Sequence, residues 1–364
     1  MEEVRERSME DERELSETNS FTSAMTLNQI GVPQAPERFV LPPLERPNHT
    51  LRLNPSTTLP VIDIASLHKP SLRPWVIDEI RLACKELGFF QVINHGIPST
   101  FINGAIDTAT EFFNLPSEEK MHLASADVHK PIRYGTSMNH VADKVHFWRD
   151  FIKHYSYPIS TWIHLWPSNP PSYKEKMGNY AKATQAVQKQ LMEVVLESLG
   201  LKTDYLHEEI EEGSQVMAVN CYPACPEPDL ALGMPPHSDY GYLTILIQSQ
   251  PGLQIMDNDN NWYLIPVIEG ALLVQLGDQI EVMSNGRYKS VLHRATLNNE
   301  RTRISIASLH SLALEKKVGP APELVDEEHP LAYNEGSFRD FLDHISGNDI
   351  TKQRRYIDTL KKNP

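Results

Sequence analysis

The sequence predicts a mainly β protein with helical additions, in which a helical N-terminal region precedes a double-stranded β-helix (jelly-roll) core. Two observations support this prediction. Short β-type runs follow one another between residues 216 and 309, and turn residues such as Gln250-Pro251-Gly252 separate them. The longer runs with helical spacing lie before residue 213. Short strands without interleaved helices favour an antiparallel double sheet over βαβ units.

The region before residue 213 is predicted to contain four helices and two short strands. In residues 75–87, apolar side chains such as Val76 and Ile80 recur at helical spacing, and charged residues occupy the opposite side. Similar patterns predict helices at residues 100–113, 117–123 and 174–199 and strands at residues 59–64 and 89–93. The aromatic-rich stretch 130–172 is expected to be an irregular loop, either a lid or a packed connection.

The predicted jelly roll begins after Gly213, where alternating β-type patterns replace the helical ones. Its expected strands are residues 216–222, 242–247, 253–256, 262–265, 271–276, 280–283 and 303–309. Turn residues such as Ser284-Asn285-Gly286 lie between these runs. The mouth of such a barrel is a natural pocket for a ligand.

These patterns divide the chain into four parts. Residues 1–38 are charged and polar, and we expect a disordered tail. Residues 39–212 form the helix-and-strand region that packs on the core. Residues 213–315 form the jelly-roll catalytic core, and residues 316–364 form a C-terminal helical segment.

Composition narrows the range of partners. The chain has 364 residues and a net charge of −14, so as a whole it repels nucleic acid and anionic membranes. Three cysteines are too few for a disulfide framework. The N-terminus has no apolar signal region, and no apolar stretch is long enough to cross a membrane. We therefore expect a cytoplasmic protein, acting as a monomer, with no nucleic-acid or membrane partner.

His237, Asp239 and His293 form a candidate metal site. A lone His-x-Asp carries little information, because chance would supply about one such triplet in a chain with 15 histidines. On an extended segment, however, residues i and i+2 point to the same side, so His237 and Asp239 can reach one ion. A later strand of the same barrel can supply His293. Two imidazoles and one carboxylate are the ligand set of non-haem Fe(II) oxygenases.

Other histidines fit a metal site less well. In His207-Glu208-Glu209 the helical pattern makes residues i and i+2 diverge. His95 lies in a turn and is expected to have a structural role. Zinc remains an alternative for the three-ligand set, since zinc enzymes also use three protein ligands and an open position.

Arg303 and Ser305 separate these alternatives. They are again i and i+2 on a predicted strand, so the guanidinium and the hydroxyl project into the same space. A planar guanidinium beside a hydroxyl suits one carboxylate of a small diacid. A surface salt bridge of Arg303 is the structural alternative, but its position shortly after His293 favours a role in the site.

The chain resembles the plant 2-oxoglutarate- and Fe(II)-dependent dioxygenases from Leu59 to about Leu360. The segments that carry the resemblance are LPVIDIASL, ELGFFQVINHGIP, FFNLPSEEK, NCYPACPEP, HSDYGYLTILIQ, EGALLVQLGDQIEVMSNGRYKSVLHRA and RISIASL, in this order. The resemblance implies that His237, Asp239 and His293 are the catalytic Fe(II) ligands. The residues that it assigns to the cosubstrate 2-oxoglutarate are Arg303, Ser305, Tyr222 and Asn220. It also implies oxidative decarboxylation of 2-oxoglutarate to succinate with O₂, and ascorbate as reductant.

Within this family the chain is most similar to the flavanone 3-hydroxylase-like and downy-mildew-resistance-type oxygenases. This similarity implies hydroxylation or desaturation of a small aromatic plant metabolite, a flavonoid or a related phenolic such as salicylate. Ala218 departs from the basic residue that relatives often carry, and Leu309 departs from the Phe of some flavonoid-acting members. The expected substrate-pocket residues are Tyr134, Phe147 and Leu309. A hormone or an alkaloid is the alternative substrate, and a non-catalytic jelly-roll binding protein is the alternative class.

Overall fold

The computed structural model describes residues 21–47, 59–138, 141, 143–347 and 355–362. Within them, an eight-stranded and a four-stranded sheet form the two walls of a jelly roll. The large sheet has the order β1 (Val61–Asp63), β2 (Phe89–Ile93), β10 (Leu272–Leu276), β7 (Leu243–Gln248), β12 (Arg303–Ser311), β5 (Ser214–Tyr222), β4 (Asp150–Tyr157) and β3 (Ile132–Thr136). The small sheet has the order β6 (Met234–His237), β11 (His293–Ala295), β8 (Leu253–Met256) and β9 (Trp262–Leu264). The predicted fold class is confirmed.

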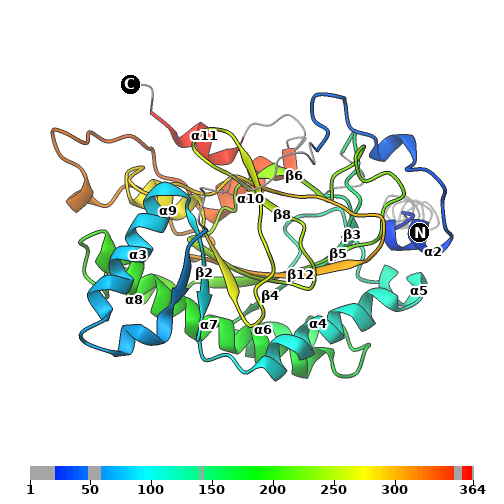
Figure 1. Ribbon diagram of the computed structural model, residues 1–364, viewed down its shortest axis with the longest axis horizontal. Helices are drawn as coiled ribbons and strands as arrows, with labels where there is room; N and C mark the ends of the chain where they lie inside the picture. The colour runs from blue at the N-terminus through cyan, green and yellow to red at the C-terminus, as the bar shows by residue number, and fades with distance from the viewer. Residues whose placement is uncertain (1–20, 48–58, 139–140, 142, 348–354, 363–364) are drawn as a thin grey trace, which may run out of the picture.

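Helices cover the outer side of the large sheet. In Figure 1, α4 and α7 lie along one side of the strands and α10 and α11 lie on the other. The α-helices are α2 (Ala24–Gln29), α3 (Arg73–Glu86), α4 (Ser99–Asn114), α5 (Ser117–Met121), α6 (Ile159–Trp162), α7 (Tyr173–Ser198), α8 (His207–Glu211), α9 (Asp278–Met283), α10 (Phe338–Gly347) and α11 (Tyr356–Leu360). None of the helices in the described part of the chain combines the length and apolar character needed to cross a bilayer.

Alternation along the strands gives the large sheet two different faces. Ile152, Val219 and Ile306 lie side by side on β4, β5 and β12, and they pack in the core shared with α7. The opposite face includes Ala218 and packs against residues of the small sheet such as Ile255. We call this second face the interior face. The site described below lies on it and on the small sheet opposite.

The predicted disordered tail over residues 1–38 is wrong for its described part, while residues 1–20 lie outside the described residues. Helix α2 packs against the large sheet, and both oxygens of the Asp150 carboxylate accept backbone N–H groups of Ala24 and Met25 at 2.8 and 2.9 Å. Asp150 is fully buried, and a buried carboxylate without donors is strongly unfavourable. The N-terminal segment supplies those donors, which polar composition alone did not reveal.

The stretch 130–172, predicted to be irregular, contains β3 and β4. These strands extend the large sheet beyond β5 with antiparallel pairing. The sequence pattern concealed them because large aromatic residues lie on both faces: Phe151 is opposite Asn220 on the interior face, whereas Tyr134 packs with the helices. Successive side chains therefore point to opposite faces of the sheet, but their hydrophobicity does not alternate.

The predicted strand at residues 280–283 is also wrong, because these residues belong to α9. Gly277 precedes the helix as its N-terminal cap residue, and every residue of α9 is buried. A short apolar run has the same appearance in a buried strand and in a buried helix. The other predicted helices and strands occur with small differences at their ends.

Candidate metal and cosubstrate site

The three candidate metal ligands meet between β6, β11 and the turn after β6. His293 on β11 is the antiparallel partner of His237 on β6, so the two imidazoles lie side by side with ring centroids 4.1 Å apart. Asp239 follows β6 by two residues, and its Oδ1 lies 3.8 Å from the Nε2 atom of each histidine. One ligand atom from each residue lies within 4.8 Å of the others, which is the spacing that a single bound ion requires.

Backbone carbonyls fix the orientation of both imidazoles. The Nδ1 atom of His237 lies 2.8 Å from the carbonyl oxygen of Pro235, and that of His293 lies 3.2 Å from the carbonyl oxygen of Val291. A carbonyl only accepts hydrogen bonds, so each Nδ1 carries the proton and each Nε2 keeps its lone pair. Metal-binding histidines are commonly held in this way. Both Nε2 lone pairs therefore face the same point.

The carboxylate of Asp239 is held by a neighbouring strand. Its Oδ2 accepts a hydrogen bond from the Thr244 hydroxyl at 2.6 Å, which leaves Oδ1 directed toward the histidines. The backbone carbonyl of Asp239 accepts the N–H of Asp278 at 2.8 Å. Both contacts hold the turn after β6 against β7 and α9, and they thereby orient the Asp239 carboxylate.

The environment keeps His237 neutral. Burial lowers the pKa of its imidazole, the adjacent His293 lowers it further, and Asp239 opposes both effects. A neutral imidazole is the form that binds a cation, because protonation would occupy the Nε2 lone pair. Two imidazoles and one carboxylate leave half of an octahedral coordination sphere open, which suits Fe(II).

The four residues predicted for 2-oxoglutarate lie on two paired strands of the interior face. Arg303 on β12 is opposite Tyr222 on β5, and Ser305 is opposite Asn220. The guanidinium carbon of Arg303 lies 4.8 Å from the centre of the Tyr222 ring, and the Asn220 amide lies 3.5 Å from the Ser305 hydroxyl. The structure therefore brings together all four side chains that the sequence proposed.

Arg303 has a donor available for a ligand. Its Nε donates to the backbone carbonyl of Gln250 at 3.1 Å, and its Nη2 donates to the side chain of Gln248 at 2.9 Å. Its Nη1 is buried and has no hydrogen-bond partner among the described residues. Burial lowers the pKa of Arg303, and a carboxylate would compensate for the lost solvation. One carboxylate of 2-oxoglutarate fits this position.

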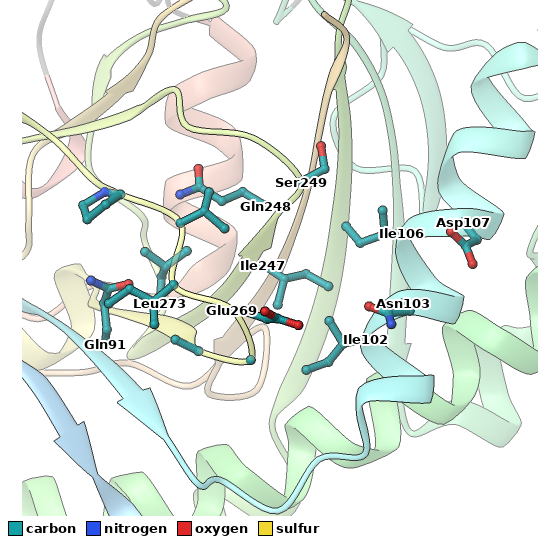
Figure 2. A pocket seen from close by; sticks show the side chains of 15 residues that line it. Gln91, Ile102, Asn103, Ile106, Asp107, Ile247, Gln248, Ser249, Glu269 and Leu273 are labelled. Carbon is teal, nitrogen blue, oxygen red and sulfur yellow. The ribbon is translucent and has the colours of Figure 1, made fainter.

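A cavity of about 240 Å³ lies at the end of the barrel next to this site. Figure 2 shows it between Ile102 and Ile106 of α4 and Gln248 and Leu273 of the sheet. Gln248 joins the cavity to the cosubstrate residues, since its Oε1 accepts the hydrogen bond from Arg303. The iron-ligand candidates do not line the cavity. The cavity therefore lies between α4 and the sheet, and Gln248 is the lining residue that contacts a cosubstrate candidate.

Arg149 is a residue of the site that the sequence did not indicate. It is buried, its Nη1 donates to Asn220 at 3.1 Å and contacts the sulfur of Met234, and its Nε and Nη2 donate to the carbonyl of Ser137. Arg149 thus fixes the orientation of the Asn220 amide through its Oδ1 atom. The signal was available in the sequence: alternation places Arg149 and Phe151 on one side of β4, but only if the stretch is recognised as a strand.

Two of the three predicted substrate-pocket residues lie elsewhere. Tyr134 is fully buried on the helix-facing side, where its ring contacts Phe112. Phe147 packs in a separate apolar cluster with Leu41 and Leu232. Their assignment to the pocket is therefore wrong, because aromatic side chains in that stretch serve packing. Leu309 lies beside the interior cluster of the barrel and stays a candidate.

Gly277 packs closely against the turn after β6 that carries Asp239. A Cβ at this position would lie 2.1 Å from the carbonyl oxygen of Gly241 and 2.9 Å from that of Asp239, and backbone atoms cannot move as side chains do. We expect Gly277→Ala to destabilise the protein by about 1–3 kcal/mol, the usual range for overpacking, and to weaken iron binding. Thermal unfolding and titration with Fe(II) measure both effects. Gly319→Ala is the control, since its Cβ has only ordinary contacts; equal effects of the two variants would contradict the packing argument.

Two family models match the chain. Residues 213–311 match the 2OG-Fe(II) oxygenase superfamily, and residues 59–169 match the N-terminal region of the non-haem dioxygenases in morphine synthesis. Among curated proteins, flavanone 3-dioxygenase 3 of Oryza sativa subsp. japonica is 46% identical over 306 residues, which cover 83% of this chain and 93% of that protein. Protein DOWNY MILDEW RESISTANCE 6 of Arabidopsis thaliana is 39% identical over 311 residues, which cover 84% and 89%.

A solved structure supports the same assignment. The crystal structure of JOX2 in complex with 2OG, Fe and JA superposes with a TM-score of 0.81 at 28% identity, covering 95% of this chain and 99% of JOX2. The identity with the curated relatives extends over nearly their whole length, so it includes both sheets and the helical region. The chain is therefore a member of the 2OG-Fe(II) oxygenase superfamily, an oxidoreductase that uses Fe(II), 2-oxoglutarate and O₂.

Proposed function

We propose that this dioxygenase hydroxylates or desaturates a small aromatic plant metabolite, a flavonoid or a related phenolic such as salicylate. In this proposal His237, Asp239 and His293 bind Fe(II). The proposed 2-oxoglutarate residues are Arg303, Ser305, Tyr222 and Asn220. The bound metal and cosubstrate supply the oxidising chemistry, and the chain positions them and the substrate.

The observation that carries the proposal is that the metal candidates and the cosubstrate candidates belong to the two facing sheets of one barrel. The two histidines and the aspartate converge on one point, and the unpaired Nη1 of Arg303 lies on the facing sheet. Apolar residues such as Leu309 and Leu246 occupy the same interior. An apolar space beside an oxidising centre suits an aromatic ring. The relatives named flavanone 3-dioxygenase and DOWNY MILDEW RESISTANCE 6 support this substrate class.

A hormone is the second candidate substrate. The JOX2 structure that resembles this chain contains JA, and another similar structure is the dioxygenase for auxin oxidation 1 from Arabidopsis thaliana. These ligands are small and partly apolar like the phenolics, so the barrel interior alone does not separate the two groups. Identity is higher to the flavanone- and mildew-related proteins, which favours the phenolic proposal.

Release of succinate from 2-oxoglutarate tests the proposal. Purified protein with Fe(II), 2-oxoglutarate and ascorbate is assayed against flavanones, flavones, salicylate, coumarins and hormone precursors, and the products are identified by mass spectrometry. We expect one aromatic compound to stimulate succinate release and to gain 16 mass units or lose two hydrogens. If only hormone precursors stimulated succinate release, the substrate would be a hormone precursor and the phenolic proposal would be wrong.

The spectrum of the anaerobic complex tests the alternative of a non-catalytic binding protein. With Fe(II) and 2-oxoglutarate we expect a weak visible absorption band, because the cosubstrate binds the metal directly in this family. Folded protein without the band, and without succinate release, would favour a binding role. The complete set of metal and cosubstrate residues supports catalysis instead.

A further inference from the structure

The interior face of β4 carries charge beside the cosubstrate residues. Alternation places Arg149, Phe151 and Lys153 on this face, and antiparallel pairing sets Phe151 opposite Asn220 and Lys153 opposite Ala218. Two residues along a strand correspond to about 7 Å. The Lys153–Ala218 pair therefore lies two residues along the strands from the Phe151–Asn220 pair, on the same face as the proposed 2-oxoglutarate residues.

Small residues lie beside Lys153 on the neighbouring strands. Lys153 on β4 is paired with Ala218 on β5, and Ala218 is paired with Ala307 on β12, so its two nearest neighbours across the sheet toward β12 are alanines. Side chains directly opposite each other in an antiparallel pair have Cβ atoms about 5 Å apart. The long Lys153 side chain can thus extend past Ala218 without steric conflict, toward the loop that precedes β3, where its ammonium contacts Val128.

A second cation lies on the other side of Lys153. Arg133 on β3 is its antiparallel partner, and the guanidinium carbon of Arg133 lies 4.9 Å from the centre of the Phe151 ring. The Lys153 ammonium donates to the carbonyl of Val128 at 2.6 Å, and Arg133 Nε donates to the carbonyl of Ser125 at 2.7 Å. Both cations therefore donate to neutral backbone oxygens and keep further donors.

Among the residues that the structure describes, neither Lys153 nor Arg133 forms an ion pair with a carboxylate. Asp127 acts on Lys153 only at longer range, and burial together with Arg133 lowers the pKa of Lys153 to about 7. A bound anion would offset both effects, because an opposite charge favours the protonated amine. Asp143 and Asp127 act on Arg133 as well, but no described carboxylate lies at ion-pair distance from either cation, so an anionic ligand would stabilise the pair.

We propose that Lys153, with Arg133 beside it, binds a carboxylate of the organic substrate, so that the enzyme prefers a small aromatic acid to a neutral flavanone. This inference rests on the proposed function, since it concerns the substrate of the same site. Arg303 and Ser305 bind the distal carboxylate of 2-oxoglutarate on β12, and Lys153 serves the second acid. The ring of the substrate then occupies the apolar interior near Leu309.

Paired acid and amide probes test this assignment. Wild type, Lys153→Met and Lys153→Arg are assayed with salicylate and salicylamide, with 4-coumarate and its amide, and with a neutral flavanone. Lys130→Met is the control, because Lys130 is an exposed cation on the loop that precedes β3, two residues after Val128, which accepts the Lys153 hydrogen bond. We expect wild type to use an acid with a KM about 10- to 100-fold below that of its amide, the effect of one hydrogen bond to a charged group. Lys153→Met should remove this preference, and Lys153→Arg should restore most of it.

The readout for 2-oxoglutarate separates this proposal from the function of the site. Lys153→Met should leave the KM for 2-oxoglutarate and its substrate-free decarboxylation unchanged, and circular dichroism should show an unchanged fold. Equal use of acid and amide by wild type, or an unchanged preference in Lys153→Met, would overturn the role of Lys153. If the enzyme still converted a flavanone, the proposed function would stand. Decarboxylation without turnover of any aromatic compound would overturn both.

Discussion

Asp239→Ala is expected to lower succinate release by at least about a thousandfold, comparable with the largest effects of removing one group at a reacting centre. Asp239 is the only carboxylate of the three-residue cluster, and its Oδ1 lies 3.8 Å from both histidine Nε2 atoms. Without it, two neutral imidazoles bind Fe(II) weakly and provide no charge compensation. Turnover with saturating Fe(II), and iron content after gel filtration, measure the effect.

The fold should survive the same substitution. The lost hydrogen bond is the one from Thr244 to a carboxylate, worth about 1.5–3 kcal/mol, while the backbone contact to Asp278 stays. Asp78→Ala, which removes an exposed carboxylate on α3, is the matched control and should retain full activity. Substantial iron-dependent turnover by Asp239→Ala would refute the assignment of the metal site.

Arg303→Lys is expected to raise the KM for 2-oxoglutarate about 10- to 100-fold while kcat changes less. The guanidinium makes two hydrogen bonds to Gln248 and Gln250, and its Nη1 stays available for a carboxylate. A lysine ammonium is a point charge, so it cannot keep both protein contacts and also present a planar pair of donors. Initial rates of succinate release across a range of 2-oxoglutarate concentrations measure the change.

Arg301→Lys is the control for this substitution, since Arg301 is exposed two residues earlier. Its KM for 2-oxoglutarate should equal that of wild type. An unchanged KM in Arg303→Lys would mean that another cation binds the distal carboxylate. Arg149 would then be the residue to test, because it lies against Asn220 on the same face.

Local patterns in the sequence were sufficient for the elements that follow one period. The long apolar stripe of α7 and the runs that became β5, β7 and β12 were predicted with small errors at their ends, because each buries one continuous face. Elements whose burial depends on distant residues were missed. Strand β4 carries large side chains on both faces, and α2 is fixed by Asp150, more than a hundred residues away.

The sequence by itself determined the class of this protein and its candidate site: the His-x-Asp spacing and the later histidine predict the metal ligands, and Arg303 with Ser305 predicts a carboxylate site. On a strand, residues i and i+2 point to the same side, so His237 with Asp239 and Arg303 with Ser305 each share one side. Only the tertiary structure decided what surrounds them. Pairing of β4 with β5 sets Lys153 opposite Ala218, and Arg149, which directly precedes β4, contacts Asn220. Pairing of β3 with β4 places Tyr134 on the helix-facing side. Pairing between strands distant in the chain sets these neighbours, so no local pattern contains them.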